Sequence, residues 1–238
     1  MFTRGQGFRS GLGARALNER LKFMYDFSDA AGFIFDCDGT LVDSLDVWDE
    51  AEADLVRQAG HLTEDQMDEI HAVPFDECAR IFHEQYGVGE STQAVWEHLE
   101  GRLMRYYRDE ACALPGVPEF LEKLHGMGIP CTVVSSSPQR YINAALDRLG
   151  LSDCFVKVVS TEDTRTSKQD PTIYRVAMEA MGSTLQNTWA VDDAPYAIKV
   201  MHELGLKTIA PVNGAGPDRV ARYAGNADIV VETLEELV

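Results

Sequence analysis

Basic residues are scarce in this sequence, since its 238 residues carry 21 Lys and Arg against 39 Asp and Glu, a formal net charge of −18 at pH 7. A protein of that charge repels the phosphates of nucleic acids and anionic lipid surfaces alike. We therefore expect neither nucleic acid nor a membrane as a partner. An anionic substrate would have to be held by a few local cations, by backbone N–H groups or by a bound metal ion, because the overall field opposes it.

Paired cysteines and long apolar runs are absent from the sequence as well. The five cysteines are odd in number and scattered, and no two form a C-x-x-C pair, which favours reduced thiols. No run approaches the roughly 18 apolar residues that a membrane-spanning helix needs, and no apolar signal-peptide stretch stands near the N-terminus. We expect a cytoplasmic protein whose residues 1–28 form a basic N-terminal extension. The composition is compatible with a monomer and leaves the oligomeric state open.

The pattern of apolar residues changes along the chain. The apolar run Gly32–Phe35 is too short for a helix and is followed by Asp36, which predicts a buried strand. Residues 45–111 then place apolar residues three and four apart with no strand-like run. This spacing predicts helices over 47–60, 63–70, 74–86 and 91–112. Thr63 and Gln66 stand at capping-box spacing where the second of these helices begins.

From residue 112 onward the chain alternates between two patterns. Amphipathic spacing predicts helices over 117–125, 139–149, 171–181 and 194–204, and apolar runs predict strands over 130–134, 155–159, 188–191, 207–210 and 228–231, before a terminal acidic helix. Buried strands alternating with helices indicate a doubly wound, Rossmann-like α/β fold with a parallel sheet. We therefore expect a core of residues 29–44 and 112–238, with an all-helical cap inserted at 45–111.

Polar residues stand where the predicted strands end, which is the edge at which doubly wound sheets bind ligands. In chain order these polar residues are Asp36 and Asp38, Ser135, Lys168, and Asp192 with Asp193. Asp36 and Asp38 lie on the same side of an extended segment. One carboxylate can therefore attack a phosphorus atom while the other serves the leaving group.

The segment 33–44, FIFDCDGTLVDS, resembles the first motif of the haloacid dehalogenase superfamily, D-x-D-G-T-[LV]-x-D-[ST]. The segments around Ser135, Lys168 and Asp192-Asp193 are similar to the other three motifs, in order and at suitable spacing. The resemblance covers about residues 31–211 and includes the placement of the cap. It implies that Asp36 is a nucleophile forming an aspartyl-phosphate, and that Asp38 is the general acid and then the base that activates water.

The cluster of acids predicts a metal ion. Four carboxylates at one edge could not all stay ionised unaided, and hard oxygen donors without His or Cys suit Mg²⁺. The resemblance implies a side-chain oxygen of Asp36, the backbone carbonyl of Asp38 and a side-chain oxygen of Asp193 as ligands, with Asp192 beside them. Which member of the pair Asp192-Asp193 ligates directly stays open, and capping of the helix over 194–204 is another role for the pair.

The two remaining motif residues are expected to bind the phosphoryl group. The Ser135 hydroxyl and the N–H groups that follow it would hold a phosphoryl oxygen, and Lys168 would balance phosphoryl charge and fix the nucleophile. Seen alone, Ser135 and Lys168 would be ordinary loop residues, but their register with the other motifs favours the functional interpretation. The chain departs from the family's usual Gly-Lys-Pro around the lysine, where it has Ser167-Lys168-Gln169.

The resemblance implies a Mg²⁺-dependent phosphatase acting on a small phosphorylated metabolite, with the substrate itself left open. An alternative is a sugar-phosphate mutase of the β-phosphoglucomutase type, which grips a second phosphate in its cap. Residues 46–110 hold five Arg and no Lys against seventeen acids, and Phe75 stands where the mutase has an arginine, which weighs against that alternative. A remote alternative is a non-catalytic phosphate-binding protein. Trp48, Tyr106 and Tyr107 are predicted to be core residues of the cap, with Trp48 a candidate pocket residue.

Overall fold

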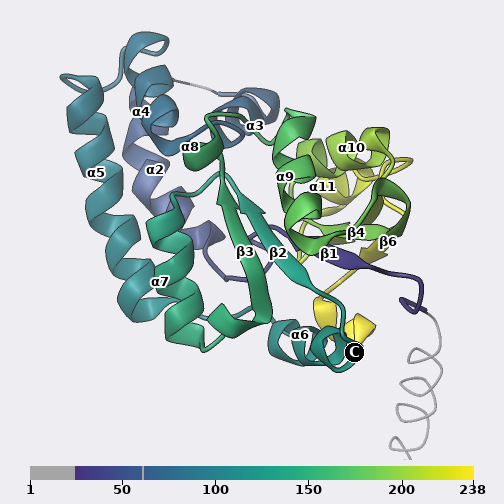
Figure 1. Ribbon diagram of the computed structural model, residues 1–238. Coiled ribbons are helices and arrows are strands. Elements are labelled where there is room, and N and C mark those ends of the chain that lie inside the picture. The colour runs from purple at the N-terminus through teal and green to yellow at the C-terminus, as the bar shows by residue number, and fades with distance from the viewer. Residues whose placement is uncertain (1–24, 61) are drawn as a thin grey trace, which may run out of the picture.

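The computed structural model describes residues 25–60 and 62–238, so most of the predicted N-terminal extension lies outside the described residues. Within them, six strands form one parallel sheet (Figure 1). The strands are β1 (Gly32–Phe35), β2 (Cys131–Ser135), β3 (Phe155–Ser160), β4 (Thr188–Val191), β5 (Lys207–Pro211) and β6 (Ile229–Val231). Each strand begins and ends within one residue of its predicted place, and the doubly wound α/β prediction is confirmed.

The strand order β3-β2-β1-β4-β5-β6 places β1 at the centre of the sheet, hydrogen-bonded to β2 on one side and to β4 on the other. The chain winds outward from β1 to β3, then returns and continues on the opposite side. Such a reversal leaves a crevice beyond the carboxyl ends of the two central strands. Asp36 directly follows β1 and Asp192 directly follows β4, so both acids stand at that crevice.

Helices cover both faces of the sheet because the side chains of β1 alternate between them. The covering helices are α6 (Val117–Gly126), α7 (Gln139–Leu149), α9 (Pro171–Met181) and α10 (Pro195–Leu204). Phe33 and Phe35 pack against Phe120 of α6, with ring centroids 5.7 and 6.1 Å apart. Ile34 belongs instead to the apolar cluster formed with α9 and α10. Burial on both faces explains why the sequences of the central strands are continuously apolar.

The segment between β1 and α6 consists of helices joined by short connections. The helices are α2 (Leu45–Ala59), α3 (Glu64–His71), α4 (Phe75–Glu84), α5 (Thr92–Arg105) and the π-helical turn η1 (Tyr106–Glu110). The predicted capping box is confirmed, because Thr63 and Gln66 each accept the backbone N–H of the other with their side chains. The predicted helix over 91–112 is α5 continued directly by η1, and it ends two residues earlier than predicted. Its last turn is the π-helical turn η1, a geometry that apolar spacing does not distinguish from an α-helix.

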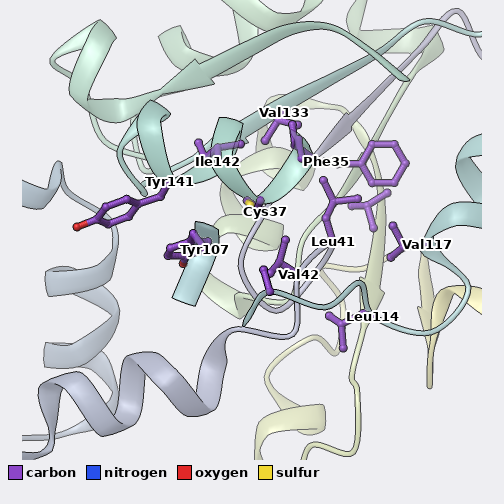
Figure 2. Close-up of a cluster of buried hydrophobic side chains, with 14 of the residues drawn as sticks. Phe35, Cys37, Leu41, Val42, Tyr107, Leu114, Val117, Val133, Tyr141 and Ile142 are labelled. Atoms are coloured by element: carbon purple, nitrogen blue, oxygen red, sulfur yellow. The ribbon is translucent and has the colours of Figure 1, made fainter. Parts of the chain in front are cut away.

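The two connections between these helices and the sheet lie side by side. Val42 forms an antiparallel bridge with Ala113, and the Leu114 N–H donates to the Leu41 carbonyl at 3.1 Å. Figure 2 shows the apolar cluster at this crossing, where Leu41 and Val42 lie near Leu114 and Tyr107. The loop that follows β1 is therefore anchored to the connection that returns from the helices to the sheet.

The remaining helical elements of the described chain are short. They are η2 (Ser152–Cys154), α8 (Thr161–Thr164), η3 (Leu185–Asn187), α11 (Pro217–Ala221) and η4 (Leu234–Leu237). The predicted acidic helix at the C-terminus is the 3₁₀ turn η4, since the segment has room for a single turn only. The five-residue α11 was not predicted, because it is too short to repeat an apolar spacing. Among the residues that the structure describes, none of the helices has the length and apolar character to cross a membrane.

Candidate active site

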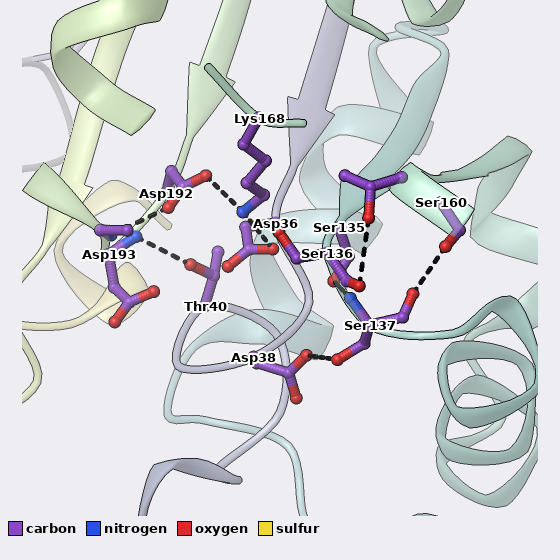
Figure 3. Close-up of polar contacts among 12 residues, drawn as sticks. Asp36, Asp38, Thr40, Ser135, Ser136, Ser137, Ser160, Lys168, Asp192 and Asp193 are labelled. Carbon is purple, nitrogen blue, oxygen red and sulfur yellow. Dashed lines mark hydrogen bonds and ion pairs between the residues drawn. The ribbon is translucent and has the colours of Figure 1, made fainter. Parts of the chain in front are cut away.

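The loop after β1 places Asp36 against a buried lysine. Asp36 is 5% exposed, and its Oδ1 lies 2.6 Å from Lys168 Nζ, which also lies 2.8 Å from Asp192 Oδ2 (Figure 3). Lys168 comes from the loop before α9, so its ammonium group joins the ends of two strands, β1 and β4, to the connection between β3 and α9. The structure therefore brings together the predicted nucleophile, the predicted cation and the first acid of the Asp192-Asp193 pair.

Burial and mutual charge set the ionisation of this cluster. Burial raises the pKa of Asp36 well above its usual range, and Lys168 opposes that rise. Burial would lower the pKa of Lys168, but Asp192 and Asp36 outweigh it and raise the pKa, so the ammonium stays charged. Burial and the charge of Asp192 raise the pKa of Asp193 to about 7, against the pull of Arg219. Excess negative charge is thus concentrated at this edge of the sheet.

Three buried carboxylates can hold a metal ion together. Oxygens of Asp36, Asp192 and Asp193 all lie within 4.8 Å of one another. The loop after β1 approaches Asp193 closely, because a Cβ built on Gly39 would be 2.6 Å from Asp193 Oδ2 and Gly39 has φ of +72°. Thr40 Oγ1 accepts the Asp193 N–H at 3.1 Å and links the same two loops. Carboxylate donors in this arrangement fit a hard cation such as Mg²⁺.

Asp192 and Asp193 contact different groups of the protein. Asp192 Oδ2 accepts from Lys168, and its Oδ1 accepts the Ala194 N–H at 2.8 Å. Asp193 Oδ2 pairs with Arg219 Nη2 at 2.8 Å. The capping role considered for the pair is wrong, because Ala194 occupies the N-cap of α10 and no side chain caps that helix.

The Asp38 carboxylate lies outside the three-carboxylate cluster and accepts three hydroxyl hydrogen bonds. Ser44 Oγ donates to its Oδ1 at 2.6 Å and Ser137 Oγ donates to its Oδ2 at 2.6 Å. Tyr107 Oη also donates to Oδ1 and itself accepts the indole N–H of Trp48 at 2.6 Å. The prediction of Tyr107 as a core residue is confirmed by its full burial but was incomplete. The missed signal is that a buried tyrosine hydroxyl needs a hydrogen-bond partner.

The loop after β2 presents hydroxyl groups to the same site. Ser135 is buried, and its Oγ accepts the Ser137 N–H at 3.1 Å. The neighbouring Ser136 Oγ is also buried but has no hydrogen-bond partner among the described residues. A buried hydroxyl without a partner costs free energy, so Ser136 is suited to a ligand oxygen. Ser136 was not among the predicted site residues.

A cavity of about 660 Å³ joins the sheet edge to the helical segment above it. Its core side is lined by Asp36, Asp38, Ser135, Ser136, Lys168, Asp193 and Arg219. Its other side includes Trp48, Asp49, Asp68, His71 and Phe75, which belong to α2, α3 and α4. The alternative of Trp48 as a pocket residue is therefore confirmed. Arg219 of α11 and Arg222, which directly follows α11, also line the cavity, and neither was predicted as a site residue.

Two ion pairs and a backbone hydrogen bond connect helix α3 of the cap to the core beside the cavity. Arg222 pairs with Asp68 and with Glu64 Oε2 of α3, the latter at 3.1 Å. In addition, the backbone N–H of Lys168 donates a hydrogen bond to the backbone carbonyl of Ala72, just after α3, at 3.1 Å. The end of α3 is thereby fixed directly over the loop that carries Lys168.

Known proteins resemble this chain over most of its length. It is 29% identical over 210 residues to hexitol phosphatase A of Escherichia coli, covering 87% of this chain and 92% of that protein. It is 27% identical over 205 residues to the phosphorylated carbohydrates phosphatase of Thermotoga maritima, covering 86% and 95%. It is also 27% identical over 208 residues to the phosphoglycolate phosphatase of Rhodospirillum rubrum, covering 79% and 82%.

Solved structures show the same fold. CbbY from Rhodobacter sphaeroides, in complex with phosphate, has a TM-score of 0.69 at 17% identity, with 87% of this chain and 96% of that chain covered. The β-phosphoglucomutase from Clostridium difficile has a TM-score of 0.68 at 18% identity, with 88% and 93% covered. The sequence family of haloacid dehalogenase-like hydrolases matches residues 30–205. This chain therefore belongs to the haloacid dehalogenase-like hydrolase family.

Proposed function

We propose that this hydrolase is a Mg²⁺-dependent phosphatase that cleaves a small phosphorylated metabolite through an aspartyl-phosphate on Asp36. The observation that carries the proposal is the contact of the buried Asp36 with Lys168 at 2.6 Å, beside two further buried carboxylates and at the floor of a cavity. Relatives named as phosphatases of hexitols, carbohydrates and phosphoglycolate support phosphatase activity here.

In the first step, a carboxylate oxygen of Asp36 forms a bond to phosphorus while the bond between phosphorus and the leaving oxygen breaks. Protonated Asp38 gives its proton to that oxygen, so the leaving group departs as a neutral alcohol. In the second step, Asp38 takes a proton from water as the water oxygen attacks phosphorus. Inorganic phosphate leaves and the Asp36 carboxylate is restored.

Positive charge and hydroxyl donors hold the transferred group. Lys168 and the hydroxyls of Ser135 and Ser136 would bind phosphoryl oxygens and orient the phosphorus for attack. The side chains of Asp36 and Asp193 and the backbone carbonyl of Asp38 would hold Mg²⁺, whose charge neutralises the phosphoryl oxygens when it is bound. Asp192 has both oxygens engaged by Lys168 and by the Ala194 N–H, which supports Asp193 as the direct ligand of the pair.

The contacts of the cap arginines favour a phosphatase over a sugar-phosphate mutase. A mutase must hold a second phosphate while its intermediate reorients, and an arginine on the cap side can grip that phosphate with two hydrogen bonds. In the described part of the cap, each arginine pairs with a neighbouring acid and none lines the cavity; these residues are Arg57, Arg80, Arg102, Arg105 and Arg108. Phe75 is buried and lines the cavity instead.

We propose a cytoplasmic location, which the five free cysteines support. A small phosphorylated substrate is the only binding partner that the proposal requires. A non-catalytic phosphate-binding role would leave the full set of acids at the crevice without a purpose.

A panel of phosphorylated metabolites, assayed for phosphate release with Mg²⁺ and again with EDTA, tests the proposal. We expect Mg²⁺-dependent release that the Asp36→Asn variant lacks. Absence of release from every compound, in a folded preparation that still binds phosphate, would establish the non-catalytic alternative. Coupling the same samples to glucose-6-phosphate dehydrogenase, with β-glucose 1-phosphate and a bisphosphate primer, separates the mutase. Efficient isomer formation with negligible phosphate release would overturn the phosphatase proposal.

A further inference from the structure

The cap holds a buried glutamate, Glu52, beside a histidine that lines the cavity, His71, and neither has a part in the proposed chemistry. Glu52 of α2 is 2% exposed, and its two carboxylate oxygens lie 3.2 and 3.0 Å from Nε2 of His71, the last residue of α3. The His71 side chain is 39% exposed and lines the cavity. A carboxylate beside Nε2 keeps a proton on that nitrogen. The second ring nitrogen, Nδ1, has no hydrogen-bond partner within residues 25–60 and 62–238 and is the atom left for a ligand.

His71 is held at a fixed place relative to the reaction centre. The next residue, Ala72, accepts the Lys168 N–H with its carbonyl at 3.1 Å. One turn earlier on α3, Asp68 pairs with Arg222 of the core. Both contacts connect the end of α3 to the core, and His71 lines the same cavity as Asp36 and Lys168.

The charged groups around His71 favour its protonated form. Those that face it are Glu52 and Asp49 from α2 and Asp68 from its own helix. Burial favours the neutral ring, but these three carboxylates outweigh it and raise the pKa of His71. Protonated His71 presents an N–H donor at Nδ1 to an oxygen of the bound substrate.

The cap side of the cavity otherwise offers acids to a ligand. Asp46 and Asp49 of α2 both line the cavity, and neither forms an ion pair within the described residues. A carboxylate or second phosphate on the leaving group would meet these negative charges at close range. A hydroxyl group suits the same surroundings, because it can donate to Asp49 and accept from His71. The volume of about 660 Å³ also exceeds what a two-carbon leaving group fills.

From this arrangement, and resting on the proposed phosphatase function, we propose that His71, Glu52 and Asp49 form a hydroxyl-binding site for the leaving group. The substrate is then the monophosphate of a neutral polyol or sugar, and not of a hydroxy acid. His71 and Asp49 contact the leaving group, while Glu52 positions His71. None of the three takes part in bond making or breaking.

The first test compares substrates with the wild-type enzyme. We expect kcat/KM for hexitol 6-phosphates or hexose 6-phosphates to exceed that for phosphoglycolate by about tenfold or more, since a site that binds substrate hydroxyls discriminates against compounds lacking them. p-Nitrophenyl phosphate serves as a third substrate, because its leaving group has no free hydroxyl and reports on the core chemistry alone. Preference for phosphoglycolate, with p-nitrophenyl phosphate cleaved, would overturn the inference and leave the phosphatase function standing. Failure to cleave any of the three would instead refute the phosphatase function itself.

The second test uses variants of His71 and Glu52. His71→Ala should raise KM for the best polyol or sugar phosphate by about tenfold or more, the value of a lost hydrogen bond to a charged group. The rise in KM for p-nitrophenyl phosphate should be clearly smaller. Glu52→Gln should show a weaker form of the same pattern, and His71→Gln, which retains an N–H donor, should recover part of the loss. The matched control is His83→Gln, since His83 bonds the Val88 carbonyl at 2.9 Å and does not line the cavity.

The losses measured with the different substrates distinguish direct contact between His71 and the leaving group from an indirect effect through the protein structure. An equal loss with polyol phosphate and with p-nitrophenyl phosphate would mean that His71 acts through the Lys168 loop, and would overturn the inference. No change with either substrate would overturn it as well. Asp49→Asn should narrow the preference for polyol phosphate over phosphoglycolate, because it removes a repulsive charge. An unchanged preference would remove Asp49 from the site.

Discussion

Tyr107 donates a hydrogen bond to the Asp38 carboxylate across 69 positions of the sequence. Its ring is fully buried and stacks on Tyr141, with centroids 5.1 Å apart and planes inclined by 13°. Tyr107 belongs to the π-helical turn η1, so an irregularity at the end of the cap helices orients an acid in the first motif of the core. Through the indole of Trp48, which donates to the same tyrosine oxygen, the contact extends to the start of α2.

Tyr107→Phe should therefore impair the general acid while leaving the nucleophile in place. A hydrogen bond to a charged group contributes about 1.5–3 kcal/mol, so we expect kcat with an alkyl phosphate to fall by about tenfold or more. The loss should be smaller with p-nitrophenyl phosphate, whose leaving group needs little protonation. Steady-state kinetics with both substrates measure the difference. Tyr106→Phe is the control, because that hydroxyl bonds the Asp43 carbonyl instead; equal losses with both substrates would contradict an effect through Asp38.

Asp36→Asn should abolish phosphate release without unfolding the protein. The amide is nearly isosteric with the carboxylate but is not a nucleophile. Lys168 retains Asp192 as its partner at 2.8 Å, so the substitution does not leave a buried charge alone. Phosphate release and far-UV circular dichroism, recorded on one preparation, measure both outcomes. Asp54→Asn, on the exposed face of α2, should retain full activity. Substantial turnover by the Asp36 variant would remove Asp36 as the nucleophile.

Mg²⁺ should raise the melting temperature of the wild-type protein. Binding to the folded state alone stabilises it by about 2.7 kcal/mol at a concentration about a hundred times Kd. Asp193→Asn should lose most of this gain, because Asp193 is the member of its pair with a carboxylate oxygen left for the metal. Asp218→Asn, an exposed acid beside Arg219, should keep the full Mg²⁺ response. Differential scanning fluorimetry over a Mg²⁺ series gives both values, and an unchanged response in the Asp193 variant would move the metal to other ligands.

The sequence located those site residues that directly follow buried strands. Asp36, Asp192 and Asp193 were predictable because an apolar run ending in acids marks a strand end, and parallel strands bring such ends to one edge. Lys168 depended on its register with those motifs. Tyr107 could be placed only as a buried helical residue, because its contact with Asp38 depends on how the cap packs against the core.

Contacts between side chains on separate helices could not be predicted from the sequence either, because they too depend on how the helices pack. Glu52 and His71 lie 19 positions apart on α2 and α3, and no local pattern specifies that the two helices bring them within 3.0 Å. Arg219 belongs to α11, whose five residues are too few for any periodicity. Side-chain geometry between elements is set by tertiary packing, whereas the order and type of the elements are set largely by local pattern.

The contact between Glu52 and His71 should make the stability of the folded protein depend on pH above 6.5, the ordinary pKa of histidine. Because the folded state holds His71 with a pKa above its ordinary value of 6.5, the folded protein binds more protons than the unfolded chain between 6.5 and that higher value. The stabilisation from His71 is therefore complete below pH 6.5 and is lost as the pH rises through the pKa of the folded state. Other groups at the cavity, Asp193 among them, titrate nearby, so the informative quantity is the difference between two proteins.

We expect the melting temperature of wild type to exceed that of His71→Gln by the largest margin near pH 6, and the margin to shrink steadily toward pH 9. Glu52→Gln should flatten the same dependence, since it removes the charge that holds the proton on His71. Thermal unfolding in a series of buffers of equal ionic strength measures the margin. A margin for His71→Gln that grows with pH would show that the folded state favours the neutral ring, and that His71 offers substrate an acceptor in place of a donor.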